Sequence, residues 1–235
     1  MPPPQQKVKI EWSPNFAYAI GIIASDGCLS RDKRHIFLKS ADKELIEKFR
    51  TALNIKNKIG RSGRGGTLEK KYFHLTFGDV VFYKFLNKIG LTSAKSKSIK
   101  KVNVPKEFFA DFVRGLSDGD GSFYVFWDKR WPGSFGFRLS FASASLPFLE
   151  WIKGGLARFY NVRGFFHKGK GVMNLEYTKG DSKKLFFAMY HSGNTLFLNR
   201  KYYKIKSALE KDKIFGLRYL QKPRSLGSSV VRALP

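Results

Sequence analysis

Cysteine is nearly absent from this sequence: Cys28 is the only one among 235 residues. A lone cysteine excludes an intramolecular disulfide and a zinc site built from cysteine ligands. Long apolar runs are also lacking, since no stretch approaches the roughly 18 residues of a membrane span. Residues 1–9 lack the apolar core of a signal peptide. We therefore expect an intracellular protein that is not secreted and has no membrane partner.

Acidic residues are scarce beside basic ones. The chain has 18 Asp and Glu against 44 Lys and Arg, a formal net charge of +26. Such an excess costs self-repulsion in the folded state and usually reflects a polyanionic partner. Residues 1–100 carry 20 basic and 8 acidic side chains, and residues 101–235 carry 24 and 10. Because the excess is spread evenly, we expect both parts of the chain to face the same kind of partner.

The sequence contains an internal repeat. Residues 19–27 read AIGIIASDG and residues 113–121 read VRGLSDGDG, so that Asp26 and Asp120 occupy corresponding positions. Shorter matches follow in the same order and pair residues 40–42 with 143–145, 53–55 with 160–162, and 78–79 with 180–181. Because the order is kept and the shifts fall in expected loops, chance is a poor explanation.

The repeat predicts two similar halves, at residues 14–92 and 105–215, joined by a linker at 93–104. Residues 1–13 are assigned to an N-terminal extension, and residues 216–235, where the pattern fades, to a loosely ordered tail. Hydrophobic residues make up 43% of the chain and include 23 Phe, enough for a sizeable core.

Each half is predicted to contain a helix, two strands, a helix, two strands and a helix. Between residues 135 and 141, Phe and Leu alternate with small or polar residues, and a period of two indicates a strand with one buried face. Helix N-caps are expected at Asp42, Asp79, Ser145 and Asp181. We therefore expect an α+β fold of two αββαββα halves, with helices behind each antiparallel sheet and a polyanion on its basic open face.

Small residues recur four positions apart in each motif helix, where they share one helix face: Gly21, Ser25, Gly115 and Gly119. Small side chains let two helix backbones approach closely. If the two motif helices pack together, Asp26 and Asp120 become neighbours at their C-terminal ends.

Two neighbouring carboxylates at helix C-termini are unfavourable, because they meet the negative ends of two helix dipoles and repel each other. Hard divalent cations offset this cost, and Mg²⁺ binds through one or two carboxylates together with phosphate oxygens and water. An Asp-Gly pair after one helix is usually only a turn. Two copies at matching positions of a repeat favour a functional site over a turn. An EF-hand at residues 118–129 is excluded, because Phe123 and Lys129 replace its required Gly and Glu.

The nonamers and the element order resemble the monomeric, two-motif LAGLIDADG homing endonucleases over nearly all of residues 14–213. The resemblance implies that the two antiparallel sheets form a saddle in the major groove of a long, pseudo-palindromic double-stranded DNA site. It implies hydrolysis of one phosphodiester in each strand with Mg²⁺, leaving short 3′ overhangs, and a monomer. Mn²⁺ or Ca²⁺ are expected to replace Mg²⁺ in binding.

The resemblance also assigns roles at the motifs. The family's catalytic, metal-binding acids fall on Asp26 and Asp120, and the preceding Ser25 and Gly119 would offer backbone carbonyls to the metals. The inner acid of the motif is Ala24 in the first half and Asp118 in the second, a tolerable departure because that position is not a metal ligand.

The resemblance also assigns two further kinds of position near the metals, one polar and one basic. A polar residue at a strand end falls on Ser40 and Ser143. A catalytic basic residue before the last helix of each half falls on Lys95 and Lys201, with Lys97 and Arg200 as alternatives. A lysine there would neutralise charge near the scissile phosphate, and a contact to the phosphate backbone is an equally good interpretation.

DNA contacts are expected from the open faces of the strands and from the loops beside them. Arg and Lys can bond guanine, Asn adenine, and Glu can accept from cytosine, although many such residues touch only phosphate. The candidates are His35, Phe37, Lys39, Lys56, Lys58, Arg61, Arg64, Tyr72, His74, Thr76, Arg138, Ser140, Arg163, Lys168, Lys170, Asn174, Glu176 and Thr178.

Three other functions stay open at this point. A maturase on the same fold would bind intron RNA, and neither charge nor fold separates it from a nuclease. A non-catalytic DNA-binding regulator would have no need of both motif acids, which this chain keeps. A ribosomal-type structural protein would explain the charge of +26 but predicts no paired acids at a helix interface.

Overall fold

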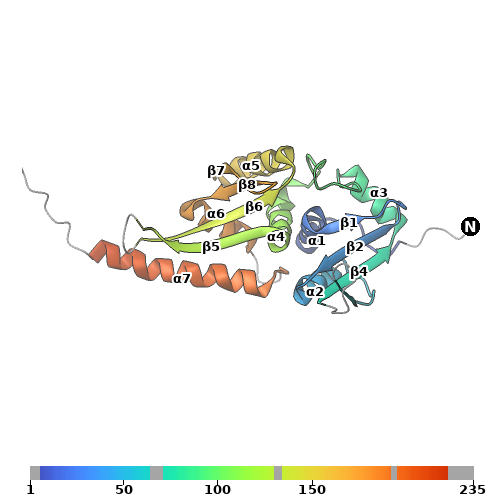
Figure 1. Ribbon diagram of the computed structural model, residues 1–235, viewed down its shortest axis with the longest axis horizontal. Helices are drawn as coiled ribbons and strands as arrows, with labels where there is room; N and C mark the ends of the chain where they lie inside the picture. The colour runs from blue at the N-terminus through green and yellow to red at the C-terminus, as the bar shows by residue number, and fades with distance from the viewer. Residues whose placement is uncertain (1–5, 64–70, 130–133, 192–194, 222–235) are drawn as a thin grey trace, which may run out of the picture.

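The computed structural model describes residues 6–63, 71–129, 134–191 and 195–221. Figure 1 shows two halves side by side, each with a four-stranded antiparallel sheet. The strand orders, β1-β2-β4-β3 and β5-β6-β8-β7, are the same order repeated. The predicted α+β class and the duplicated architecture are therefore confirmed.

The first half follows the predicted order of elements. They are α1 (Pro14–Ser25), β1 (Gly27–Leu29), β2 (His35–Ser40), α2 (Lys43–Ala52), β3 (Gly60–Ser62), β4 (Tyr72–Gly78) and α3 (Val80–Lys88). The register shows which side chains are buried. Leu38 pairs with Leu75 under the helices, whereas the adjacent pairs Phe37–Thr76 and Lys39–His74 point to the open face.

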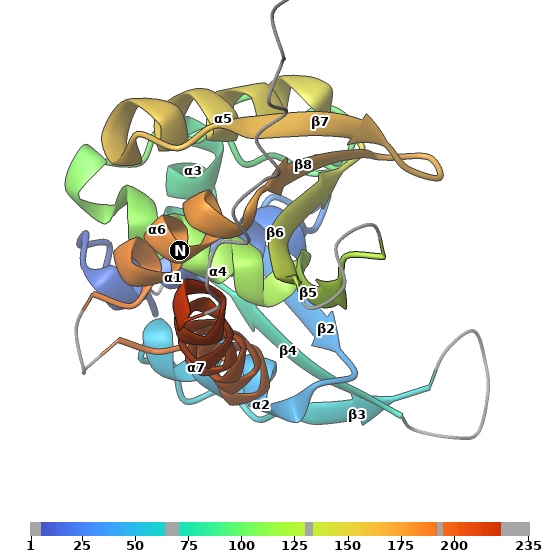
Figure 2. The ribbon, with the colours of Figure 1, turned by 90° about the vertical axis from the view of Figure 1, so that its left-hand side faces the viewer.

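The second half has the same order with two additions. It contains the 3₁₀ helix η1 (Lys106–Phe108), α4 (Phe109–Gly119), β5 (Gly121–Trp127), β6 (Phe135–Ser143), α5 (Leu146–Tyr160), β7 (Gly164–Lys168), β8 (Met173–Tyr177), α6 (Lys179–Met189) and α7 (Asn199–Gln221). The alternating residues of β6 behave as predicted, since Phe135, Phe137, Leu139 and Phe141 are all buried. Figure 2 shows the strands of both sheets gathered on one side and most helices on the other.

Helix α7 was not part of the predicted repeat. It runs to Gln221, six residues into the segment 216–235 that we expected to be a loose tail, and residues 222–235 lie outside the described part of the chain. The helix is held because Ile205 and Leu209 are buried, and because the buried Asp212 pairs with lysines of α6. No helix in the described ranges is both long and apolar enough to cross a bilayer.

Asp42, Asp79 and Ser145 occupy the N-cap positions of α2, α3 and α5, as predicted. Asp42 accepts from Glu44 N at 3.1 Å, and Asp79 accepts from Phe82 N at 2.8 Å. Ser145 occupies the N-cap position of α5, but its hydroxyl donates to a carbonyl of the linker instead. The prediction for Asp181 is wrong, because α6 begins earlier and places this residue in its first turn.

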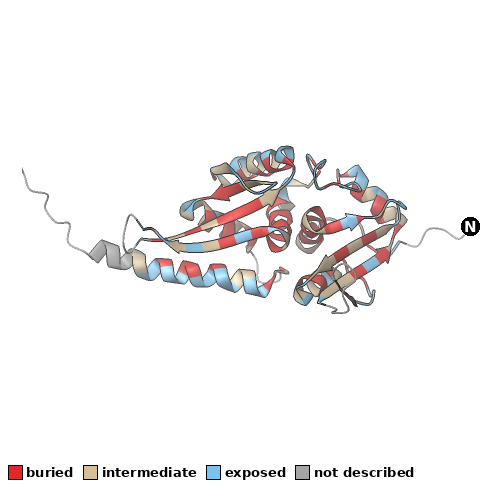
Figure 3. Ribbon diagram, in the orientation of Figure 1, coloured by how far each residue is buried: buried red, intermediate tan, exposed pale blue. Residues whose placement is uncertain are grey.

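The two motif helices α1 and α4 pack against each other at the centre of the molecule, where Figure 3 shows both as largely buried. The glycines permit this approach. A Cβ atom on Gly21 would lie 2.1 Å from the carbonyl oxygen of Phe112, and one on Gly115 would lie 2.0 Å from that of Tyr18. Both neighbours are backbone atoms, so a larger side chain forces the helices apart.

We predict that Gly115→Ala destabilises the protein by about 1–3 kcal/mol or more, because the added methyl overpacks a backbone contact. The matched control is Gly154→Ala. Gly154 is an exposed helical glycine whose added Cβ meets nothing within 4 Å. There the substitution should stabilise by about 0.5–1 kcal/mol through helix propensity. Urea unfolding measures both, and equal stability of the two variants would contradict the close helix contact.

Candidate active site and nucleic-acid interface

Asp26 and Asp120 are the C-cap residues of α1 and α4. Their backbone N–H groups continue the helices by donating to Ile22 O at 2.9 Å and Leu116 O at 3.1 Å. The close packing of the helices therefore brings the two carboxylates together. A Cβ on Gly119 would lie 2.4 Å from Oδ2 of Asp26, which shows that this carboxylate reaches the end of the opposite helix.

The site holds these carboxylates at an electrostatic cost. Burial, with a further contribution from the charge of Asp120, raises the pKa of Asp26 to about 6. Burial also raises the pKa of Asp120, while Lys201 and Lys95 act in the opposite direction on both acids. The charged pair is thus disfavoured without further positive charge, which is the condition that a divalent cation would relieve.

A lysine that donates to backbone carbonyls accompanies each motif. Lys201, in the first turn of α7, donates from Nζ to Ser117 O at 2.7 Å, Gly119 O at 3.0 Å and Gly121 O at 2.8 Å. An ammonium group there neutralises the negative end of the α4 dipole. Burial lowers the pKa of Lys201 to about 8, against the opposing effect of nearby acids.

Lys95 is the counterpart in the first half. It is 6% exposed, donates from Nζ to Gly27 O, and burial lowers its pKa. Gly27 and Gly121 correspond in the repeat, so the two lysines reach equivalent positions from different elements. The alternatives lie elsewhere, since Lys97 is exposed and Arg200 pairs with Asp42 at 2.6 Å.

The short polar residues at the motifs make local contacts. The hydroxyl of Ser25 donates to Ile22 O at 3.1 Å. The hydroxyls of Ser40 and Ser143 each accept from the backbone N–H two residues ahead, at 3.0 and 3.1 Å. Ser143, Ser25 and Asp120 line a common cavity of about 220 Å³, which places Ser143 near Asp120.

The residues present fit a divalent cation that is completed by its substrate. No group of three His, Cys, Asp or Glu side chains within the described ranges could form a metal cage. Two carboxylates of raised pKa are nevertheless a sufficient protein contribution for Mg²⁺, which retains water and takes phosphate oxygens as further ligands. We expected the backbone carbonyls of Ser25 and Gly119 to face metals. In the structure the carbonyl of Gly119 accepts a hydrogen bond from Lys201.

The inner motif position holds Ala24 in the first half and Asp118 in the second, a difference that we expected to be tolerable, but the structure gives Asp118 specific partners. Its carboxylate is buried in α4 and accepts from Tyr18 OH at 2.9 Å and Leu198 N at 2.7 Å. Burial raises its pKa to about 6. The available signal in the sequence was the mismatch with Ala24, which shows that the two motifs are not equivalent.

Most of the residues predicted to contact DNA in the first half lie on the open face of its sheet. His35, Phe37, Lys39, Tyr72, His74 and Thr76 lie on this face by register. Lys56 and Lys58 are exposed in the loop after α2. Arg61 pairs with Phe73 and stacks on its ring, so it lies on the helix-bearing face at the sheet edge. Arg64 lies outside the described residues.

The open face of the second sheet is built differently. Arg138 lies between the rings of Phe126 and Phe165, with its guanidinium carbon 5.6 and 5.3 Å from their centroids. Its Nη1 donates to Glu176 Oε2 at 3.0 Å. Glu176 is 4% exposed and Ser140 is 6% exposed. This burial corrects the expectation that Glu176 and Ser140 present their side chains to bases, because Glu176 instead holds Arg138 in place.

The remaining candidates of the second half lie on its periphery. Asn174 lies on the open face of β8, and Lys168 ends β7 on the other face. Arg163 and Lys170 are exposed in the connections before and after β7, and Thr178 occupies the N-cap position of α6.

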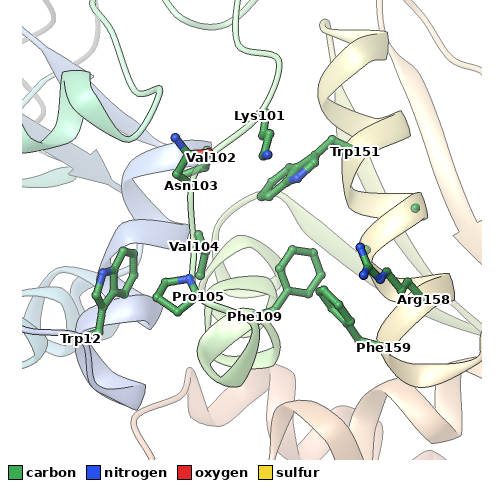
Figure 4. A pocket seen from close by; sticks show the side chains of 12 residues that line it. Trp12, Lys101, Val102, Asn103, Val104, Pro105, Phe109, Trp151, Arg158 and Phe159 are labelled. Carbon is green, nitrogen blue, oxygen red and sulfur yellow. The ribbon is translucent and has the colours of Figure 1, made fainter.

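A larger cavity, of about 720 Å³, lies between the linker and α5 (Figure 4). Its aromatic lining includes Trp12, Phe109, Trp151 and Phe159. None of the residues predicted for catalysis or DNA binding lines it, so it is separate from the paired acids.

Known proteins similar to this chain belong to the LAGLIDADG class. Residues 13–90 match the LAGLIDADG-like domain family. The two halves together have the duplicated LAGLIDADG fold of solved structures, and the resemblance predicted from the sequence is confirmed. Comparison with curated protein sequences finds no match.

Three structures illustrate this similarity. The LAGLIDADG meganuclease I-AabMI bound to uncleaved DNA is 14% identical with a TM-score of 0.60, over 88% of this chain and 92% of that one. I-SmaMI bound to an uncleaved DNA target with calcium ions is 12% identical with a TM-score of 0.60, over 91% and 95%. Full-length WhiA from Thermatoga maritima is 14% identical with a TM-score of 0.52, over 92% and 69%. At such identities the likeness establishes the fold alone.

We predict that Asp26→Asn stabilises the metal-free protein at pH 7. Because the folded pKa of Asp26, about 6, exceeds the ordinary 3.8, the folded state binds more protons between these values, and wild-type stability falls as pH rises through them. The substitution should add on the order of 1–3 kcal/mol at pH 7 and little near pH 4.

Urea unfolding in chelator from pH 4 to pH 8 measures this difference. Asp32→Asn is the control with the opposite sign, because hydrogen bonds from His35 lower the pKa of the exposed Asp32 to about 2. Its carboxylate contributes stability above pH 4 that is lost as pH falls towards 2. A variant Asp26→Asn that is less stable than wild type at pH 7 would contradict the strained pair.

Proposed function

We propose that the protein is a site-specific endonuclease that binds a long, pseudo-palindromic DNA duplex and hydrolyses one phosphodiester in each strand with divalent metal. The observation that carries the proposal is the pairing of Asp26 and Asp120 at the α1–α4 interface, where a lysine donates to backbone carbonyls beside each motif. A purely structural interface would not retain two mutually repelling carboxylates.

The residues of the chain divide the work. Asp26 and Asp120 would hold a cation, which when bound supplies positive charge to the oxygens of the scissile phosphates. Lys95 and Lys201 are placed to add fixed positive charge beside those phosphates. The strand faces would bind the duplex, with the overall charge of +26 supplying affinity for its backbone.

The fold by itself does not decide between a nuclease and a DNA-binding regulator. WhiA, described as having an N-terminal LAGLIDADG domain, shares it. I-DmoI, described in complex with DNA and Mn, and I-SmaMI, described with calcium ions, support a divalent metal in proteins of this fold. The proposal therefore rests on the acids of this chain, and its direct test is the cleavage of DNA.

The first test is incubation with a randomised duplex library and Mg²⁺, followed by sequencing of the cut ends. We expect one family of related sites cut in both strands, with short 3′ overhangs. Asp26→Asn and Asp120→Asn should each lower cleavage of at least one strand by roughly a hundredfold or more, with DNA affinity changed only slightly. Glu47→Gln, on the exposed surface of α2, is the matched control and should cut normally. Cleavage by the double variant Asp26→Asn, Asp120→Asn would contradict the mechanism.

A second prediction concerns Glu176 and Arg138. Glu176→Gln removes the charge that holds Arg138, so base discrimination in the half-site bound by the second sheet should fall roughly tenfold, within the 1–3 kcal/mol of a good bidentate base contact. Affinity for unrelated DNA should rise, because a negative charge is lost. Cleavage rates on singly substituted targets measure the effect. Glu47→Gln, on the surface of α2, is the control, and equal effects of the two substitutions would refute the role of Glu176.

A further inference from the structure

In the second half, Asp118 binds the segment that carries Lys201, whereas the corresponding residue of the first half is Ala24. We infer that Asp118 is a positioning residue that fixes Lys201 beside Asp120, so that cleavage of one DNA strand depends on Asp118 and cleavage of the other does not. The inference rests on the endonuclease function proposed above.

Asp118 joins three parts of the molecule. It lies in the last turn of α4, is 1% exposed, and uses Oδ2 to accept from Tyr18 OH of α1 and from Leu198 N. Its Oδ1 is buried without a hydrogen-bond partner among the described residues. Hydrogen bonding by this carboxylate in the described chain is therefore directed to α1 and to the segment that enters α7.

Leu198 is the residue on which the first turn of α7 is built. Its carbonyl accepts from the backbone N–H groups of Lys201 and Tyr202, both at 3.0 Å. Its side chain is fully buried. A hydrogen bond of 2.7 Å from its N–H to Asp118 therefore fixes the start of α7 on α4.

The position of Lys201 follows from this attachment. Its Nζ binds three carbonyls at the end of α4, those of Ser117, Gly119 and Gly121, which flank Asp118 and Asp120. Residues 117–121, from the end of α4 to the start of β5, thus provide three things. They are the anchor for α7, the acceptors for the lysine and the acid proposed to bind metal. Without the anchor, the lysine loses its fixed relation to Asp120.

The position of the first half that corresponds to Asp118 cannot provide such an anchor. The residue at the inner position is Ala24, which has no polar side-chain atom. Lys95 instead lies in a turn of the connecting segment, where its carbonyl accepts from Ser98 N at 3.0 Å and Ile99 N at 2.8 Å. Ser145 of α5 donates in turn to Ile99 O. Since the two lysines are held by different elements, loss of Asp118 should affect only the site of Lys201.

The experiment uses a cognate duplex with each strand labelled separately. Asp118→Ala, which copies the first half, should slow cleavage of one strand roughly tenfold or more, leaving the other within about twofold. It should be the same strand that Lys201→Met slows. Adding Asp118→Ala to Lys201→Met should have little further effect, because both act through the same amine. Equal losses in both strands, or additive losses, would overturn the inference.

Tyr18→Phe is the matched control, since it removes the other partner of Oδ2 but keeps the bond from Leu198 N. Both strands should then be cut at near wild-type rates. Asp118→Leu, similar in size and without a hydrogen-bond acceptor, is the second variant in case Asp118→Ala does not fold, and the same strand bias is expected. A bias absent from every folded Asp118 variant would refute the inference.

A measurement without DNA or metal separates this inference from the proposed function. Asp118→Ala should speed amide hydrogen exchange at residues 198–202, whereas Tyr18→Phe should not. If the wild-type protein cuts no DNA, the nuclease proposal fails while the exchange result still decides whether Asp118 anchors α7. Unchanged exchange in the Asp118 variants would overturn the anchoring role.

Discussion

The contact between α1 and α4 is the constraint on which the rest of this structure depends. Gly21 and Gly115 let the two backbones touch, and no larger side chain can be placed at either position without moving backbone atoms. This single contact forms the junction between the halves and brings their C-terminal aspartates together. The sheets lie to either side of it, so the spacing of the helices also sets how the two open faces lie relative to each other.

Bringing the acids together creates strain that the surrounding residues only partly relieve. Burial and repulsion keep the pKa of Asp26 well above its ordinary value, while Lys95 and Lys201 neutralise the helix ends rather than forming direct ion pairs with the acids. The paired acids thus lower the stability of the fold, and the divalent cation proposed above would offset that cost. Such a balance is expected of a catalytic centre and not of a structural interface.

The halves share a fold but have diverged in how they hold their functional groups. The first half takes its lysine from the linker, and the second takes it from α7, a helix that the repeat does not contain. The open faces differ as well: Phe37 and Lys39 lie on one sheet, whereas Arg138 is stacked between two rings on the other. A duplicated scaffold can therefore present two unlike surfaces, as the proposed recognition of an imperfectly symmetric DNA site would require.

The sequence by itself determined the elements and the paired acids. The repeat, the period-two alternation in β6 and the small residues of the motif helices depend on local spacing, which a linear pattern records directly. Only the tertiary structure decided which side chains are free, because contacts between distant segments leave no periodic signal. Glu176 accepts a hydrogen bond from Arg138, and Asp118 accepts from Tyr18 and Leu198. Helix α7 packs against β5 and β6 and forms ion pairs with α6. Each of these outcomes depends on residues that meet only after the two halves have folded.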